Sequence, residues 1–190
     1  KKTRLERNEI YRARDFLPWQ LDRNIFIKGT DEDFANRIAN NSGQAEKFAQ
    51  FINSQVVPLI DEKFRGSQER TLIGHSFGGV FTTFMLLCHP ENFAKYLAIA
   101  PVLASEYYAQ KEMFDALTKK LPTAEKLVYF SIGSEEKDDR MSDYIGAVKN
   151  ACLEIGKLPN ILSKFEIIEG ENHASVVTPS IWRGLKFFNN

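Results

Sequence analysis

A serine, a histidine and a group of acids are the residues of this sequence whose types and spacing could do chemistry. Ser76 lies in the pentapeptide Gly74-His75-Ser76-Phe77-Gly78, which matches the pattern G-x-S-x-G. A serine hydroxyl becomes a good nucleophile when a base takes its proton. The imidazole of His173, with an ordinary pKa of about 6.5 for that group, is suited to do so near neutral pH. A carboxylate can then fix the tautomer of the imidazole and stabilise its positive charge.

The pentapeptide lies where the chain must turn sharply. Residues 71–73 predict a short buried strand, and the apolar run 80–87 predicts a buried helix. A turn this tight forces Ser76 into a strained backbone conformation, and we expect a Cβ at either flanking glycine to collide with it. The helix N-terminus would offer N–H groups to a developing oxyanion, with that of Phe77 as the first donor. The alternative is a glycine-rich turn whose serine only caps the helix.

Strands and helices alternate from Thr71 to the end of the chain. Further strands are predicted at residues 96–100, 127–132 and 164–168, and further helices at 103–121, 140–155 and 180–188. For the last helix we expect a core face of Ile181, Trp182, Leu185 and Phe188. This alternation predicts an α/β fold with a parallel sheet covered by helices on both faces.

The N-terminal part shows a different pattern. The polar residues 29–41 predict an irregular surface segment, and residues 42–64 predict a helix with Ser42 as its N-cap. Pro58 is expected to bend this helix.

The carboxyl ends of parallel strands bring their loops to one edge of the sheet. The loop after the third predicted strand is acidic, and we expect Glu136 to be the catalytic acid because it follows the strand-closing Gly133 by three residues. Asp138 is the second candidate, and Glu135 and Asp139 come after it. The alternative for this loop is a solvated charge cluster, and for the histidine a loop position without a role.

Composition excludes several classes of function. The 190 residues have a formal net charge of zero, so the sequence lacks the basic surface typical of nucleic-acid binding. No apolar run approaches the ~18 residues of a membrane span. Cys88 and Cys152 lie in apolar helical patterns and are interpreted as buried thiols. We expect no metal site and no cofactor, and the sequence leaves the compartment open.

Four segments resemble the Putative esterase family of the α/β-hydrolase superfamily, which contains esterase D and enterochelin (siderophore) esterases. Residues 70–80 resemble its R-T-L-I-G-H-S-x-G-G segment, and the others are R-x-R-D-L-T-P at 12–18, a Phe-rich helix at 43–64 and E-G-x-x-H-x-S at 169–175. The resemblance implies that Ser76 is the nucleophile, His173 the base and Glu136 the acid. Residues 100–105 depart from the S-P-S-L-W-W of siderophore-esterase relatives, which puts a flat aromatic substrate in doubt.

The resemblance also implies strands before residue 12 that this chain lacks. We therefore expect residues 1–190 to be a single α/β-hydrolase domain, a C-terminal fragment of a longer chain. The strand that carries the serine would then have an unpaired edge, which predicts a homo-oligomer through that edge or incomplete activity.

The function predicted from these features is a serine hydrolase that cleaves a small-molecule carboxylic ester through an acyl-enzyme. The alternatives are a non-catalytic or degenerate binding module on the same scaffold, and an acyltransferase. Substrate contacts are predicted for four residues: His75, Arg12, Arg14 and Tyr107. Of these, the arginines would suit an anionic substrate.

Overall fold

The computed structural model describes residues 4–23, 31–103, 121–136 and 143–189. The chain divides into two compact units, Lys1–Gly66 and Ser67–Asn190. The expectation that residues 1–190 make one domain stays a prediction.

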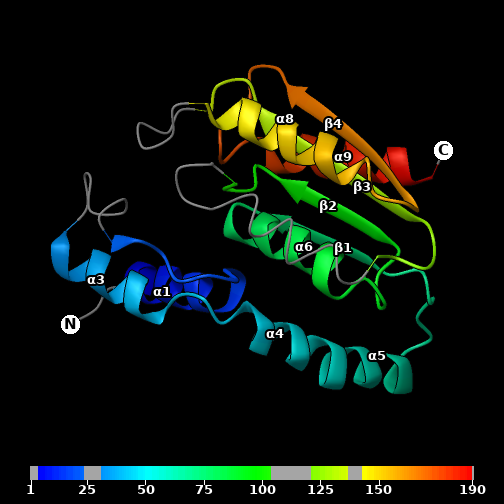
Figure 1. Cartoon of the computed structure of the whole chain (residues 1–190), viewed down its shortest axis with the longest axis horizontal. Coiled ribbons are helices and arrows are strands. Elements are labelled where there is room, and N and C mark those ends of the chain that lie inside the picture. Colours follow the sequence, from blue (N-terminus) through cyan, green and yellow to red (C-terminus); the bar gives the residue numbers. More distant parts are fainter. Residues whose placement is uncertain (1–3, 24–30, 104–120, 137–142, 190) are drawn as a thin grey trace. The chain divides into compact units, whose positions relative to one another are not determined.

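A four-stranded parallel sheet is the centre of the second unit (Figure 1). The strands follow one another in space as they do in sequence: β1 Thr71–His75, β2 Lys95–Ile99, β3 Lys126–Gly133 and β4 Ile161–Ile168. Every position of β3 except Leu127 is buried, whereas β1 and β4 are half-exposed. The predicted parallel α/β fold is confirmed. In the part of the chain that the structure describes, the central strands are buried and the two edge strands are partly exposed to solvent.

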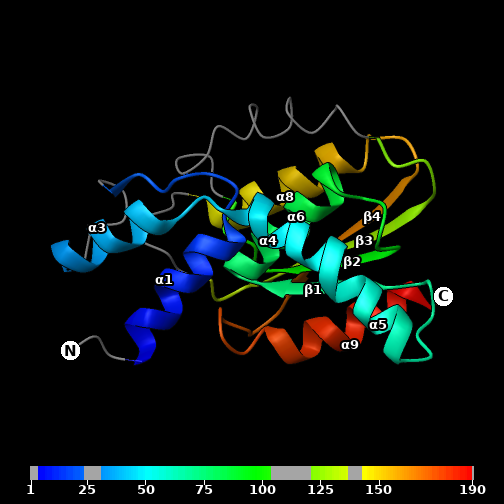
Figure 2. The ribbon, with the colours of Figure 1, turned by 90° about the horizontal axis from the view of Figure 1, so that it is seen from below.

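Helices cover both faces of this sheet. Figure 2 shows α9 (Val177–Phe188) on one face, and α6 (Phe77–Cys88) and α8 (Tyr144–Ile155) on the other. Helix α9 packs on β2 and β3. Almost all of α6 is buried, as its continuous apolar run predicted. The helix expected at 103–121 falls largely on residues 104–120, outside the described residues.

The orientation of α9 differs from the predicted one. Ser180, Gly184 and Phe188 form its buried face, while Trp182 is 73% exposed and Leu185 is 39% exposed. A Cβ at Gly184 would lie 2.9 Å from a methyl group of Leu97, so the helix approaches the sheet along its small residues. The expected core face was therefore wrong for these two large residues, because close approach of the backbone, and not side-chain hydrophobicity, sets which side faces the sheet.

Strand β1 lies at the edge of the described sheet and pairs with β2 only. Ile73 is paired in register with Leu97, so both side chains point to the face that α9 covers, yet Ile73 is 40% exposed. Arg183 and Phe187 direct one flank of α9 toward β4, which leaves Ile181 and Leu185 on the opposite flank. We call the three residues Ile73, Ile181 and Leu185 the β1 ledge.

A polar cluster joins β3, β4 and α9. The Tyr129 hydroxyl donates a hydrogen bond of 2.6 Å to Glu166, which also pairs with Arg183 and, at 3.3 Å, with Lys164. Burial alone would raise the pKa of Glu166, but the hydrogen bonds from Tyr129, Arg183 and Lys164 outweigh it and lower that pKa. The cluster thus ties the edge strand β4 to β3 and to α9.

We expect Glu166→Gln to lower the stability of the protein at neutral pH and to weaken its dependence on acid. A carboxyl with a lowered folded pKa stabilises above its ordinary pKa, and this contribution is lost as the pH falls through the folded value. The difference in urea midpoint between the variant and the natural protein should thus shrink from about pH 7 to about pH 3. Glu154→Gln, which removes an exposed ion pair with Lys157, is the control and should change little. A difference that grows on acidification would contradict the prediction.

The first unit consists of helices: α1 Arg4–Phe16, α3 Glu32–Asn41, α4 Ala45–Phe51, the π-helical η1 Ile52–Val56 and α5 Val57–Lys63. The prediction of an irregular segment at 29–41 was wrong for α3, whose first turn is capped by the Asp31 side chain. Ser42 closes α3 and is not the N-cap of α4. Its hydroxyl donates to the Ala39 carbonyl and accepts from the Leu21 N–H.

Pro58 changes the hydrogen bonding of the long predicted helix. Its ring lacks an N–H and crowds the carbonyl of the residue four positions earlier. The chain absorbs this in the five-residue π-helix η1 directly before α5.

Candidate active site

The turn between β1 and α6 has the strain that the sequence predicted. Ser76 has φ 61° and ψ −121°, a left-handed conformation that a residue with a Cβ rarely adopts. Its N–H donates to the Ile99 carbonyl at 3.0 Å, and its carbonyl accepts from the Val80 N–H at 3.1 Å. The Ser76 side chain makes no capping hydrogen bond to α6, which argues against the alternative of a serine that only caps the helix.

The two glycines around Ser76 do different things. A Cβ at Gly74 would lie 2.0 Å from the Gly78 carbonyl oxygen and 2.4 Å from the Thr82 hydroxyl, so glycine is required there. A Cβ at Gly78 would meet nothing within 4 Å. The expectation that both positions exclude a side chain was thus wrong for Gly78, which sits on the open side of the first turn of α6.

The acidic loop and the histidine loop are bonded to each other through the backbone. The Ser134 N–H donates to the Ile168 carbonyl at 3.0 Å, and the Glu135 N–H donates to the Glu171 carbonyl at 2.9 Å. A Cβ at Gly133 would lie 2.0 Å from the Glu171 carbonyl oxygen. Glycine at the end of β3 therefore allows the two loops to touch, and their side chains are held at one edge of the sheet.

Asn172 shapes the turn that presents His173. Its side-chain oxygen accepts from the N–H groups of Ala174 and Ser175 at 2.9 and 3.1 Å, while the Ser175 hydroxyl accepts from the Asn172 N–H at 3.0 Å. These short-range hydrogen bonds pair backbone N–H groups in a turn that lies outside the helices and strands. They fix the backbone on both sides of the histidine.

His173 and Glu136 are in direct contact. The Nδ1 atom of the imidazole lies 3.0 and 3.1 Å from the two carboxylate oxygens. The Glu136 side chain is 2% exposed and the His173 side chain 43%. A buried carboxylate needs a donor, and the Nδ1–H of the imidazole is such a donor. With the proton on Nδ1, the neutral ring has its lone pair on Nε2, the atom from which a general base acts.

The imidazole of His173 also lies beside the serine turn. Its ring centroid is 4.6 Å from that of His75, the residue directly before Ser76. Within the described residues no hydrogen bond joins the Ser76 hydroxyl to the imidazole. The arrangement thus brings a strained serine, an imidazole and a buried carboxylate to the carboxyl ends of β1, β3 and β4.

Residues 20–166 match the family model described as "Esterase: Putative esterase". The chain belongs to the Putative esterase family.

Two curated proteins are similar to this chain in sequence. The chain is 30% identical over 151 residues to the ferri-bacillibactin esterase BesA of Bacillus subtilis, a match that covers 76% of this chain and 52% of that protein. It is 28% identical over 177 residues to the siderophore enterobactin esterase of Emericella nidulans, covering 78% and 57% of the two chains. The chain therefore spans little more than half the length of these two relatives.

A solved structure of the same fold is that of the BES protein from Bacillus cereus. It has a TM-score of 0.77 and 25% identity, with coverage of 94% of this chain and 65% of that one. Together with the parallel sheet and its flanking helices, this likeness identifies the fold as α/β-hydrolase-like.

The structure places the other residues predicted for the site as follows. Asp138, Asp139 and Tyr107 lie outside the described residues. Glu135 is exposed, and its backbone N–H donates to the Glu171 carbonyl of the histidine loop. The expected oxyanion donor Phe77 is the first residue of α6 and directly follows Ser76.

Arg12 and Arg14 belong to α1 in the first unit, and both are paired with acids. Arg12 lies 2.9 Å from Glu9, and Arg14 lies 2.7 Å from Asp15. The hydrogen bonds that Arg14 donates to the Asp15 carboxylate raise the pKa of Arg14 despite partial burial. Their role in binding a substrate stays a prediction.

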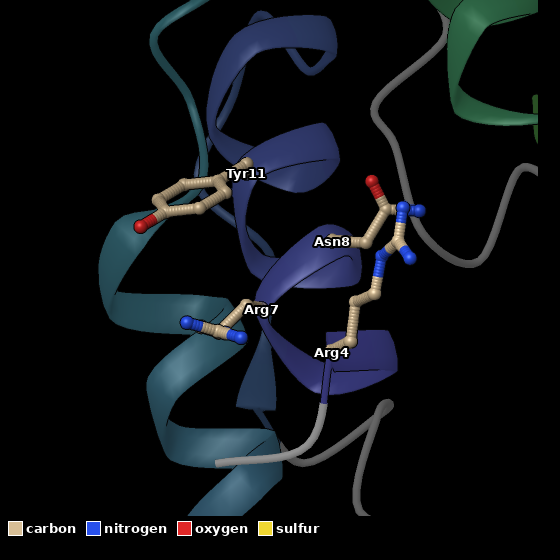
Figure 3. A pocket seen from close by; sticks show the side chains of 4 residues that line it. All are labelled: Arg4, Arg7, Asn8 and Tyr11. Carbon is tan, nitrogen blue, oxygen red and sulfur yellow. The ribbon is translucent and has the colours of Figure 1, made fainter.

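A pocket on α1 is lined by four other residues: Arg4, Arg7, Asn8 and Tyr11 (Figure 3). They follow the spacing of one helix face, and Figure 3 shows Arg4 beside Asn8. Arg4 and Arg7 were not among the substrate contacts predicted from the sequence, which named Arg12 and Arg14.

Sequence reasoning also missed Tyr144. This residue opens α8 and is 5% exposed, and its ring centroid lies 6.5 Å from that of His173. A tyrosine in an amphipathic helix is usually a core residue, so its type alone could not have indicated a place beside the histidine. Within the described residues, no group of three or more His, Cys, Asp and Glu side chains could hold a metal ion. None of the described helices is long and apolar enough to cross a bilayer.

Proposed function

We propose that this chain carries the catalytic residues of a serine esterase that works through an acyl-enzyme. Ser76 attacks the carbonyl carbon of the ester while Nε2 of His173 takes the hydroxyl proton. Glu136 accepts the hydrogen bond from Nδ1–H and stabilises the imidazolium that forms. The alkoxide of the tetrahedral intermediate is held by the Phe77 N–H at the start of α6. Collapse of the intermediate releases the alcohol with the proton from Nε2, and water then hydrolyses the acyl-enzyme by the same route.

The observation that carries this proposal is the contact of 3.0 Å between His173 and Glu136. Burying a carboxylate to 2% exposure costs free energy, and the hydrogen bond from one imidazole nitrogen offsets that cost. The other imidazole nitrogen does not contact the carboxylate and is available to accept a proton. The same imidazole lies beside the residue that precedes a serine in a strained turn. This combination is the one that nucleophilic catalysis by serine requires.

For the substrate we propose an ester bond of a siderophore. The support comes from the relatives, since BesA is a ferri-bacillibactin esterase and the Emericella protein a siderophore enterobactin esterase. The serine turn and the two loops of this chain hold catalytic groups that would act on the carboxylic ester bond of any such substrate. Acyl transfer to an alcohol would use the same residues, and analysis of the products separates it from hydrolysis.

A second candidate function is a binding module that uses the esterase scaffold without catalysis. The observation in its favour is the lack, in the described part of the chain, of a hydrogen bond between Ser76 and His173. Such bonds are often long in free enzymes and shorten when substrate binds, so this observation does not outweigh the His173–Glu136 pair.

A fluorophosphonate probe distinguishes the two candidates. For an esterase, we expect the probe to label one serine, which peptide mass spectrometry locates at Ser76, and short-chain p-nitrophenyl esters to be hydrolysed. Both rates should rise with pH between about pH 5 and about pH 9, because only the neutral imidazole of His173 can accept the Ser76 proton. Labelling at no residue, in folded protein, would favour the binding module. A rate that is flat with pH would remove His173 from the role of base.

A further inference from the structure

Ala100, directly after β2, has a backbone conformation that is rare for its residue type. Its φ of 39° is in the left-handed region, which disfavours residues with a Cβ. Such a conformation persists only where neighbouring contacts enforce it. The Ala100 N–H donates to the Ser131 carbonyl at 2.7 Å, and the Ala100 carbonyl accepts from the Tyr144 hydroxyl at 2.5 Å. The Tyr144 side chain, from α8, thus holds the end of β2 in place.

The end of β2 in turn holds the serine turn. The carbonyl of Ile99, the residue before Ala100, accepts the N–H of Ser76 at 3.0 Å. On the other side, Pro101 packs against α6, where a Cβ at Gly79 would lie 2.9 Å from the proline ring. Any shift of residues 99–101 therefore moves the backbone from which the Ser76 hydroxyl projects.

The same tyrosine lies beside the imidazole. The ring centroids of Tyr144 and His173 are 6.5 Å apart with an angle of 40° between the rings, which is within the range of interacting aromatic pairs. The three described rings or carboxylates around His173 come from three elements: His75 from β1, Glu136 from the loop after β3 and Tyr144 from α8. The Tyr144 hydroxyl also bonds to Ala100, in the segment that supports Ser76.

We propose that Tyr144 is a positioning residue that fixes the Ser76 turn and the His173 imidazole relative to each other. Its hydroxyl sets the Ala100 carbonyl, and thereby the Ile99 carbonyl that holds the Ser76 N–H. Its ring restricts the imidazole from the side of α8. Tyr144 takes no part in bond making, and its effect is on geometry: a nucleophile and base misplaced by a fraction of an ångström react far more slowly. The consequence for turnover rests on the proposed esterase function, whereas the consequence for the Ser76 backbone does not.

Tyr144→Phe tests the proposal because it keeps the ring and removes the hydrogen bond to Ala100. We expect kcat for a p-nitrophenyl ester to fall about tenfold with KM within about twofold, since positioning affects the reaction more than binding. Tyr144→Leu, which also removes the ring beside His173, should lose more. Tyr129→Phe is the matched control: it removes another buried hydroxyl, bonded to Glu166 at 2.6 Å, that supports β4 and α9. It should reduce the thermal midpoint without the tenfold loss of kcat.

Amide hydrogen exchange gives a readout that does not depend on activity. In Tyr144→Phe the Ser76 N–H should exchange about tenfold faster, the change expected from loss of one hydrogen bond to a buried carbonyl, whereas in Tyr129→Phe it should not. Unchanged Ser76 exchange in Tyr144→Phe, or equal losses of kcat in the two Phe variants, would overturn the proposal. If the natural protein shows neither turnover nor probe labelling, the esterase function fails, and the Ser76 exchange rate still decides the role of Tyr144.

Discussion

Replacing Ser76 with alanine should reduce the hydrolysis of p-nitrophenyl esters by about 10⁴-fold or more. The variant lacks the only atom that can form the acyl-enzyme in the proposed mechanism, so residual turnover would come from stabilisation of the oxyanion and from binding. The loss should appear in kcat with little change in the affinity for substrate, because a hydroxyl group contributes little to ground-state binding. Steady-state kinetics and the loss of fluorophosphonate labelling measure the effect.

Ser67→Ala is the matched control for this experiment. Ser67 is an exposed serine in the segment before β1, where its hydroxyl accepts the Glu69 N–H. Its replacement should leave both the rate and the labelling unchanged. Circular dichroism should show the same fold for the two variants. More than about a tenth of the natural turnover in Ser76→Ala would show that another residue is the nucleophile.

The largest effect on stability is expected for Gly74→Ala. The added Cβ would lie 2.0 Å from a backbone oxygen and 2.3 Å from the carbon of the same carbonyl of Gly78, and neither is the end of a flexible side chain. The β1–α6 turn would have to open, which breaks the contacts of a buried helix with its strand. We expect a loss of roughly 3 kcal/mol or more in the free energy of unfolding, measured by urea denaturation.

The same substitution four residues later, Gly78→Ala, should not lower the stability of the protein. Its Cβ would point into open space, and alanine in a helix is favoured over glycine by about 1 kcal/mol. We expect Gly78→Ala to be as stable as the natural protein or slightly more stable. Equal destabilisation by the two substitutions would show that the turn excludes side chains on both flanks, as the sequence pattern alone suggests.

The parts of the fold that sequence predicted are those with a strong local signal. The strand, tight turn and apolar helix around Ser76 follow from residue types within a short stretch, and the alternation after Thr71 gave the parallel sheet. The same topology put the acidic loop and the histidine loop at one edge. Position in the loop, three residues after Gly133, led to the prediction of Glu136, which lies 3.0 Å from His173 and whose role as the acid stays a prediction.

What could not be predicted depends on contacts between distant segments. Trp182 and Leu185 have the hydrophobicity of core residues, but Gly184 brings α9 onto Leu97 and turns them outward. Ser42 and Asp31 are both good capping residues, and only the tertiary structure decides which helix end each one closes. The place of Tyr144 beside His173 requires the packing of α8 on β3 and β4, which no local pattern of residues encodes.

The β1 ledge has a consequence for any extended segment that comes to lie beside β1, such as a second copy of this chain in the homo-oligomer predicted from the sequence. Main-chain bonding would accept almost any sequence, because backbone groups are alike. Selection would instead come from alternate side chains, since every second one would be directed over Ile73 toward the Ile181 and Leu185 flank of α9. An added strand should therefore be amphipathic, with an apolar residue at each of those alternate positions. A shift of such a strand by one residue would direct its polar side chains over Ile73 and would disfavour the pairing.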